Sequence, residues 1–392
     1  MTGMVSKYIA VSSGEFQETL KEELSSLGAS DIEDGYKAVS FYADKKTAYS
    51  IHLKTATASK IMEVFREGAA KDRRAIFFQA LKVKWAHLFR PNATYLVEGI
   101  AGDRGKDAPS KNDISKVVRE AIEANFAYEK KKKPQVDLKD PDIHVVAFYY
   151  RKRITISILT SGKSMHKRGY KSDRHPAPVK EHVAHSLLKM AGYDGSQTLF
   201  DPMCGSGTFA IEAAYIALQK GVLIHRKKGD FGLERLSHFD RDMWRLVQED
   251  VRGERKESPH KPIFAGDIEK RYVDMSQRHA LKARVERYIT FQQRDFFTTK
   301  APDSSGLLVV NLPYGERLSD KDEDLMAFYK AFGDRLKKEY SGWTCAVLAA
   351  DSSPWKQIGL RPYRRVQVRN GGIDCRFLLY RLYDGSLKSK YL

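Results

Sequence analysis

The stretch FDPMCGSGTF, residues 200–209, joins a short apolar run at 198–200 to an apolar helical pattern at 210–218. A strand that ends in a glycine-rich turn and opens a helix is typical of a parallel strand-helix unit. The glycines let the backbone approach a ligand closely, and the free amide groups of the helix start favour a negatively charged group such as a carboxylate. The turn has neither the GxGxxG spacing of a dinucleotide site nor the Gly-Lys-Ser/Thr of a phosphate loop, so the glycines alone do not identify the ligand.

Four more apolar runs repeat this pattern further along the chain. They cover residues 263–265, 289–292, 307–310 and 344–349 and lead into Asp267, Asp295, Asn311 and Asp351. Five successive strand-helix units predict a doubly wound parallel sheet. Because ligands of such sheets bind at the carboxyl ends of the strands, we expect the turn and these polar residues to share one site.

Two of the acidic residues are placed to bind an adenosine group. Asp267 ends the second strand, where two ribose hydroxyls would be held, and Asp295 ends the third, where it can meet an adenine amino group while Phe296 covers the ring. Each acid taken singly is better explained by a helix N-cap. Taken together and in this order, the turn and the two acids predict a ligand that carries adenosine.

The segment after the fourth strand, Asn311-Leu312-Pro313-Tyr314, resembles the Asn/Asp-Pro-Pro-Tyr/Phe motif of S-adenosylmethionine-dependent methyltransferases that act on an exocyclic amine of a base. Leu312 stands where that family usually has its first proline. An exocyclic amine is a poor nucleophile, so the site must orient it and accept its protons. The Asn311 side-chain oxygen and the Pro313 carbonyl can accept them, and Tyr314 can stack on a flipped base.

The resemblance extends over almost the whole chain, to the THUMP-domain RNA methyltransferases that make N2-methylguanine in large-subunit ribosomal RNA. It is carried by residues 53–56 and 85–89, by HKRGY and PAPVKE at 166–170 and 176–181, by an insertion at 215–262 with Phe239, Asp240 and Trp244, and by Asn370-Gly371-Gly372 at an expected last hairpin. It implies a Rossmann-like α/β methyltransferase domain preceded by α+β ferredoxin-like and THUMP domains. The corresponding boundaries are 1–53, 54–163 and 164–392.

The resemblance also implies the cofactor, the substrate and their sites. S-adenosylmethionine is the expected methyl donor, and 23S ribosomal RNA is the expected substrate and partner. The residues expected at the cofactor are Asp201, Pro202, Cys204, Gly205, Gly207, Thr208, Asp267, Ile268, Asp295, Phe296 and Asn311, and those expected to be catalytic are Asn311, Pro313 and Tyr314.

The N-terminal part reads as two small α+β modules. Strands are expected at 8–12 and 39–42 around a helix through Phe16 and Leu27, and a second helix is expected from Lys54 through Ile61, Val64 and Phe65. A strand at 95–99, a helix at 113–126 and strands at 145–150 and 153–159 complete the second module.

Positive charge is concentrated in the second of these modules. Residues 1–53 hold 5 Lys and Arg against 8 Asp and Glu, residues 54–163 hold 23 against 13, and residues 164–392 hold 40 against 29. The resulting net charges of −3, +10 and +11 give the middle module the highest density, which is the electrostatic footprint of a nucleic-acid partner. The run Lys130–Lys133 alone is explained equally well by a solvated loop.

Composition excludes several other classes of protein. The chain has 392 residues, 42% of them apolar and 30% charged, which suits a folded protein of two or three domains. It has no apolar run of 18 residues and no signal-peptide pattern near its start, so we expect a cytoplasmic protein that does not span a membrane. Three cysteines without CxxC spacing predict neither disulfides nor a metal site, and the oligomeric state is left open.

Three alternatives to the ribosomal RNA methyltransferase remain open. Transfer to a guanine N2 amine of tRNA shares every feature above. Transfer to adenine N6 of DNA uses the same amine chemistry but would not need the basic module in front of the catalytic domain. The alternative that is not an enzyme is an RNA-binding protein with an inactive methyltransferase domain, although the motif residues are all present.

Overall fold

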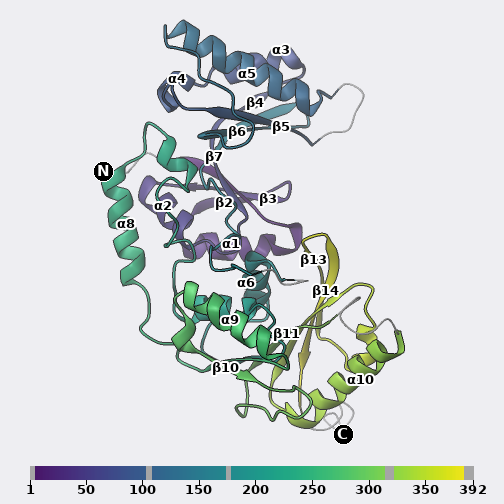
Figure 1. The fold of residues 1–392 in the computed structure, drawn as a ribbon. Helices are drawn as coiled ribbons and strands as arrows, with labels where there is room; N and C mark the ends of the chain where they lie inside the picture. Colours follow the sequence, from purple (N-terminus) through teal and green to yellow (C-terminus); the bar gives the residue numbers. More distant parts are fainter. Residues whose placement is uncertain (1–4, 103–107, 174–177, 314–321, 384–392) are drawn as a thin grey trace. The chain divides into compact units, whose positions relative to one another are not determined.

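The computed structural model describes residues 5–102, 108–173, 178–313 and 322–383 (Figure 1). The chain forms two compact units. The first holds residues up to Ser12 together with Leu20–Met165 and Leu223–Asp250, and the second holds Ser13–Thr19, His166–Val222 and the chain from Val251 onward. Each unit therefore contains segments that are far apart in the sequence.

One seven-stranded sheet runs through the first unit in the order β2-β3-β1-β4-β7-β6-β5. All neighbouring strands are antiparallel except β5 and β6. The elements of this unit are β1 (Ser6–Val11), α1 (Gln17–Ser26), which begins outside it, β2 (Ser30–Gly35), β3 (Ala38–Ala43), α2 (Lys45–Lys54), β4 (Lys60–Ala69), α3 (Arg73–Leu81), α4 (Trp85–Leu88), β5 (Tyr95–Ala101), α5 (Lys111–Tyr128), β6 (Ile143–Tyr150), β7 (Arg153–Leu159) and α8 (Arg241–Gly253), whose last residues lie outside it. Strands from the expected first and second modules thus share one sheet.

The predicted helix from Lys54 through Phe65 is wrong. α2 ends at Lys54, and Lys60–Ala69 forms strand β4 between β1 and β7. Ile61, Val64 and Phe65 fit a helical spacing, but branched and aromatic side chains also suit a strand, and pairing on both edges decides the outcome. The predicted strands at 8–12, 39–42, 95–99, 145–150 and 153–159 and the helix at 113–126 are confirmed.

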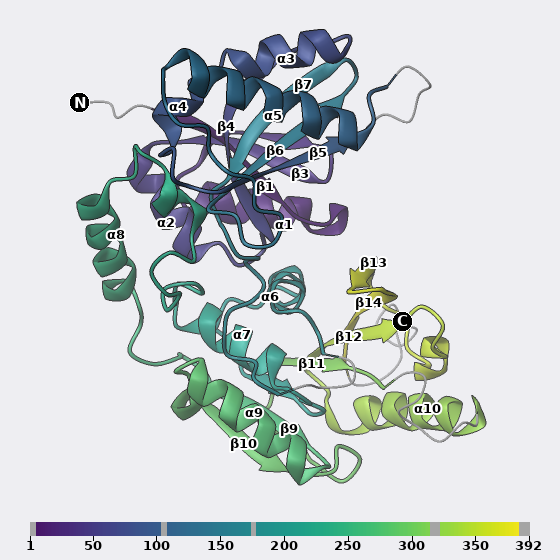
Figure 2. The same ribbon diagram turned by 45° about the horizontal axis from the view of Figure 1, so that its top comes forward.

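The insertion between residues 215 and 262 leaves the second unit and packs on the first. Trp244 of α8 contacts the Tyr49 ring of α2 edge-on, with ring centroids 5.2 Å apart, and Phe231 lies 5.2 Å from Trp244. Figures 1 and 2 both show the green α8 beside the purple α2. The insertion therefore completes the hydrophobic core of the N-terminal unit.

The second unit contains another seven-stranded sheet, in the order β10-β9-β8-β11-β12-β14-β13. Its elements are α6 (Glu181–Met190), β8 (Leu199–Asp201), α7 (Thr208–Ala217), β9 (Ile263–Asp267), α9 (Lys270–Lys282), β10 (Ile289–Gln293), β11 (Leu307–Asn311), α10 (Asp322–Glu339), β12 (Thr344–Ala350), β13 (Arg364–Asn370) and β14 (Ile373–Arg381). Neighbours among β8 to β12 are parallel, whereas β14 and β13 run antiparallel. The predicted doubly wound parallel sheet is confirmed, with an antiparallel hairpin added at one edge.

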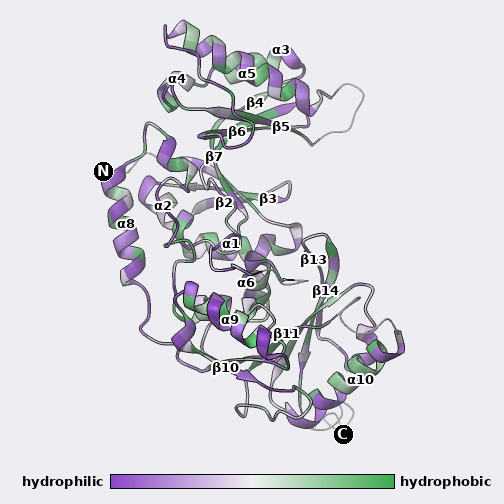
Figure 3. Cartoon of the chain, viewed as in Figure 1, coloured by the Kyte–Doolittle hydropathy of each residue, from purple (hydrophilic) through white to green (hydrophobic). Residues whose placement is uncertain are grey.

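The hydropathy pattern agrees with these layers. The helices of both units alternate hydrophilic and hydrophobic stretches along their length (Figure 3). In the second unit, Tyr329 and Phe332 of α10 are fully buried in one cluster with Leu308 and Val310 of β11. This packing fixes the carboxyl end of β11, where Asn311 lies.

Candidate active site

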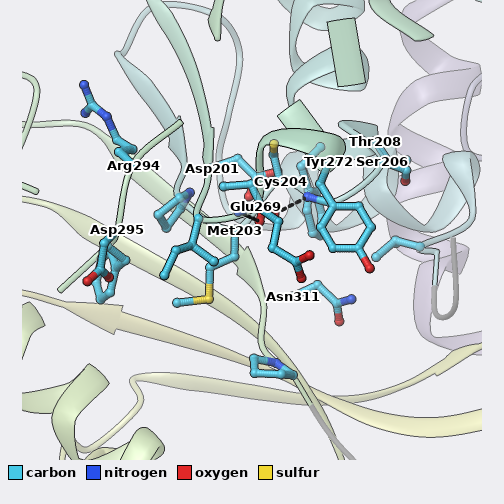
Figure 4. Close-up of a pocket in the computed structure, with 18 of the residues that line it drawn as sticks. Asp201, Met203, Cys204, Ser206, Thr208, Glu269, Tyr272, Arg294, Asp295 and Asn311 are labelled. Carbon is cyan, nitrogen blue, oxygen red and sulfur yellow. Dashed lines mark hydrogen bonds between the residues drawn. The ribbon is translucent and has the colours of Figure 1, made fainter. Parts of the chain in front are cut away.

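A cavity of ≈ 600 Å³ lies at the carboxyl ends of β8, β9, β10 and β11 (Figure 4). All of its lining residues belong to the second unit. The sequence-predicted residues that line it are Asp201, Pro202, Cys204, Gly205, Thr208, Asp267, Ile268, Asp295, Phe296, Asn311 and Pro313. Gly207 lies in the same turn, and Tyr314 lies outside the described residues. Polar residues at the ends of four parallel strands thus line one cavity, as the strand pattern in the sequence predicts.

The glycine turn has a backbone that other residues adopt only with strain. Gly205 and Gly207 have φ of 52° and 77°, in the left-handed region. A Cβ on Gly207 would lie 2.9 Å from the Cβ of Ser276, which is a clash. The Ser276 hydroxyl in turn donates to the Gly205 carbonyl at 2.8 Å, so α9 holds the turn against the start of α7.

Asp267 joins the glycine turn to the loop after β9. Its Oδ2 accepts the Gly205 amide at 3.0 Å, and its Oδ1 accepts the Glu269 amide at 3.1 Å. The side chain is buried, but each carboxylate oxygen can accept more than one hydrogen bond. Asp267 thus shapes the cavity that it lines.

Two buried oxygen atoms at the cavity have no hydrogen-bond partner among the described residues. They are Oδ1 of Asp201 and Oδ1 of Asn311, at the ends of the neighbouring strands β8 and β11. Burial raises the pKa of the Asp201 carboxyl well above its usual range, against a backbone hydrogen bond from Met203. Because unpaired buried acceptors are costly, these two atoms mark positions where donors from a ligand would bind.

The residues after β10, the third strand along the chain, line the cavity with an aromatic ring and a carboxylate. Phe296 is buried, with its ring 5.0 Å from Phe332 and 5.6 Å from Tyr340, so it forms a packed face of the cavity rather than a free cover. The Asp295 carboxylate accepts the Phe297 amide at 2.9 Å. Ile268 is 63% exposed although it is aliphatic, and its apolar surface is available to a flat ligand ring.

Hydrogen bonds hold Leu312 and Pro313, the described residues that follow β11. Leu312, at the position where the resemblance leads one to expect proline, is buried and donates its amide to the Leu348 carbonyl at 3.0 Å, a bond that proline cannot make. The Tyr329 hydroxyl donates to the Pro313 carbonyl at 3.2 Å. That carbonyl keeps a second lone pair for another donor.

Several cavity residues were missed by sequence reasoning. They are Pro178, Val179, Met203, Ser206, Phe209, Glu269, Arg271, Tyr272, Arg294, Phe297 and Phe328. Figure 4 shows Glu269 and Tyr272 on the same cavity as Asn311. The Asp-x-Glu spacing of Asp267 and Glu269 was the available signal for Glu269, whose Oε2 lies 2.6 Å from Nε of Arg271.

The three cysteines are all buried. Burial raises the pKa of Cys375 to about 11 and that of Cys204 well above its usual range, although Cys204 lines the cavity. No described helix is long and apolar enough to cross a membrane, and no three described His, Cys, Asp or Glu side chains form a group that could hold a metal ion.

This fold and this site define a Rossmann-like methyltransferase. Residues 168–378 match the model of the RMKL-like methyltransferase domain, and residues 70–159 match that of the THUMP domain. The chain belongs to the RMKL-like methyltransferase family and carries a THUMP domain in front of its catalytic domain.

Known proteins agree with this assignment. The ribosomal RNA large subunit methyltransferase K/L of Photobacterium profundum is 30% identical over 98% of this chain and 54% of its own length. The chain thus spans about half the length of the curated relatives it matches.

Two solved structures share the fold at low sequence identity. One is described as "a possible methylase from Clostridium difficile 630", with a TM-score of 0.86, 24% identity and coverage of 98% of this chain and 100% of that chain. The other is a predicted N6-adenine-specific DNA methylase from Listeria monocytogenes, with a TM-score of 0.85, 22% identity and coverage of 97% of each chain.

Proposed function

We propose that this protein transfers a methyl group from S-adenosylmethionine to the exocyclic N2 amine of a guanine in 23S ribosomal RNA. The observation that carries the proposal is a pair of buried oxygens, of Asp201 and Asn311, that have no hydrogen-bond partner in the described part of the chain and lie on one cavity that Asp267 also lines. An N-methyltransferase site needs one hydrogen-bond acceptor for the cationic ammonium of the methyl donor and another for the N–H groups of the target amine. Oδ1 of Asp201 and Oδ1 of Asn311 can fill these two roles.

The residues present fit the cofactor. Oδ1 of Asp201 suits the ammonium of the methionine part, and Asp267 suits the ribose hydroxyls. Ile268 and Phe296 offer apolar surface to the adenine ring. The Asp295 carboxylate can accept a hydrogen bond from the adenine amino group. S-adenosylmethionine, when bound, supplies an electrophilic methyl group.

The loop after β11 would orient the target amine. Oδ1 of Asn311 would accept a hydrogen bond from one N–H of the amine and the Pro313 carbonyl would accept one from the other, which would direct the nitrogen lone pair toward the methyl donor. Tyr329 fixes the Pro313 carbonyl in place. The resemblance of residues 311–314 to the motif of amine methyltransferases implies that Tyr314 stacks on the flipped base. The buried cysteines fit this mechanism, because transfer to nitrogen needs no covalent enzyme-base bond.

The RNA partner is supported by the relatives' names and by charge. The relative from Photobacterium profundum is named as a methyltransferase of large-subunit ribosomal RNA, and residues 54–163 of this chain carry 23 basic against 13 acidic residues. We keep the division into a ferredoxin-like part (1–53), a THUMP part (54–163) and a methyltransferase part (164–392), and a cytoplasmic location, as parts of the proposal.

Methyl transfer to three substrates tests the proposal. Purified protein with labelled S-adenosylmethionine is incubated with protein-free large-subunit RNA, with tRNA and with DNA, and each product is digested to nucleosides. We expect label in N2-methylguanosine from large-subunit RNA. Label in N2-methylguanosine from tRNA alone, or in N6-methyladenine of DNA, would replace the substrate and keep the amine chemistry. Label in a 5-methylpyrimidine, or none in any substrate, would contradict the mechanism.

A further inference from the structure

Three aromatic rings stack together on the surface of the first unit, and none of them lines the candidate active site. The Tyr36 ring centroid lies 6.2 Å from that of Phe148 and 6.0 Å from that of Tyr150, and Phe148 and Tyr150 are 6.1 Å apart. All three pairs are stacked, with interplanar angles of 17° to 29°. We call Tyr36, Phe148 and Tyr150 the aromatic platform.

The hydrophobic core does not account for the aromatic platform. Along β6, Val145, Ala147 and Tyr149 are buried in the core cluster that includes helices α3 and α5. Phe148 and Tyr150 alternate with them and so lie on the opposite face of the sheet, half-buried. Tyr36, in the turn between β2 and β3, is 57% exposed. Three large rings are thus kept partly in water.

In the two turns next to the aromatic platform, basic residues adopt left-handed backbone conformations that are unfavourable for residues with a side chain. Arg151 and Lys152 form the two-residue turn between β6 and β7, with φ of 48° and 55°, where Asn-Gly is the usual choice. Lys37, next to Tyr36, has a φ of 52°. Left-handed backbone costs about 1–2 kcal/mol at a residue with a side chain, so stability alone does not explain these residues.

The cations lie over the rings of the platform. Nζ of Lys37 is 5.6 Å from the Tyr36 ring centroid, and Cζ of Arg151 is 5.0 Å from that of Tyr150. Both hairpin tips therefore present an aromatic ring followed by a cation. Exposed rings offer stacking surface to any nucleobase, and adjacent cations offer charge to its phosphate.

We propose that the aromatic platform binds unpaired RNA, with one or two bases stacked on Tyr36 and Tyr150 and the neighbouring phosphates close to Lys37, Arg151 and Lys152. The proposal rests on the proposed function in that its ligand is RNA, and it adds where and in what form the N-terminal unit binds it. Because stacking needs a free base face, a single strand binds there and a duplex does not.

Binding of the full-length chain to a labelled oligouridine of about 12 nucleotides, followed by fluorescence anisotropy, tests the platform. We expect Tyr36→Ala and Tyr150→Ala each to weaken binding about 5- to 100-fold, and Tyr36→Trp to retain it. Arg151→Gln should lessen the dependence of affinity on salt. The control is Tyr128→Ala, because Tyr128 on α5 is a tyrosine of the same unit, 84% exposed and outside the platform.

Specific outcomes would overturn the platform. They are unchanged affinity of Tyr36→Ala, an equal loss in Tyr128→Ala, or an equal loss for an RNA duplex of the same length. Methyl transfer is not the readout, so the two proposals fail separately. A chain that binds oligouridine through Tyr36 but methylates no RNA keeps the platform and loses the proposed function, and the reverse result does the opposite.

Discussion

Asp267 is the residue of the site whose contribution to cofactor binding can be measured most simply. It accepts the amides of Gly205 and Glu269 and lines the cavity, where we propose that it also binds the ribose hydroxyls. We expect Asp267→Ala to weaken S-adenosylmethionine binding by about 1–3 kcal/mol in calorimetry, since a charged hydrogen bond is lost. Asp274→Asn is the control, because Asp274 is an acid of α9 that pairs with Lys270 outside the cavity. Equal affinity in both variants would remove Asp267 from the cofactor site.

Asn311 should matter for turnover more than for cofactor binding. In the proposed mechanism its Oδ1 accepts a hydrogen bond from the amine chiefly in the transition state, so Asn311→Ala should lose most of kcat and keep the affinity for S-adenosylmethionine. Cys375→Ala should keep its activity, because that thiol is buried in β14. The check is single-turnover methyl transfer beside calorimetry. Loss of activity in a folded Cys375→Ala variant would favour a covalent mechanism instead.

Among single residues, the sequence predicts the site residues that end strands and does not predict those whose place in the site depends on tertiary packing. Asp267, Asp295 and Asn311 follow apolar runs, and a parallel sheet brings such positions together. Tyr329 and Arg294 gave no such signal. Tyr329 reaches the Pro313 carbonyl from a helix 16 residues later, and only the packing of α10 on β11 brings them into contact.

The turn between β8 and α7 is the element on which the proposed cofactor site depends. Gly207→Ala combines a left-handed backbone with a Cβ 2.9 Å from Ser276, and we expect it to destabilise the unit by more than the about 1–2 kcal/mol of backbone strain alone. Gly192→Ala is the matched control, since Gly192 has a φ of 81° and open space around its Cβ position. Urea unfolding of both variants measures the difference. If Gly192→Ala costs as much as Gly207→Ala, the contact with Ser276 is unimportant.

Element types followed from sequence where the periodicity was unambiguous. The five parallel strands of the second unit are continuous apolar runs that end in polar residues, and each was predicted within a few positions. The sequence predicts a helix where β4 forms, because Ile61, Val64 and Phe65 have helical spacing although their residue types also suit a strand. The strand forms because β1 and β7 pair with both of its edges, and local sequence does not contain that information.

The insertion carrying α8 is the feature of the whole molecule that the sequence concealed. Its length could be read from the sequence, because Asp267 follows Asp201 by 66 positions. Its packing within the first unit could not, because that depends on Tyr49 far upstream. We expect Trp244→Ala to destabilise the first unit by about 3 kcal/mol, seen as faster hydrogen exchange over α2. Leu246→Ala, on the exposed side of the same helix, should leave exchange unchanged. Equal exchange in both variants would show that the insertion does not support this unit.

Stability of the molecule should fall in mild acid through a buried histidine. Burial lowers the pKa of His52 to about 4, and its ring bonds the Ala48 carbonyl at 2.7 Å and the Thr160 hydroxyl at 2.9 Å. Its folded pKa is below the unfolded value of about 6.5, so the stability that it contributes is present above pH 6.5 and is lost as the pH falls toward 4. His52→Gln should make the loss over this window shallower in urea titrations. The exposed His87→Gln serves as control, and an unchanged profile for His52→Gln would contradict the assignment.

The most direct test of the central claim is made on ribosomes. Nucleosides from the 23S ribosomal RNA of a strain that lacks this protein are quantified by mass spectrometry, with the native chain or Asn311→Ala returned to the strain. We predict that N2-methylguanosine falls in the deletion strain, and that the native chain restores it and Asn311→Ala does not. An unchanged amount of N2-methylguanosine in the deletion strain, or full restoration by Asn311→Ala, would contradict the claim.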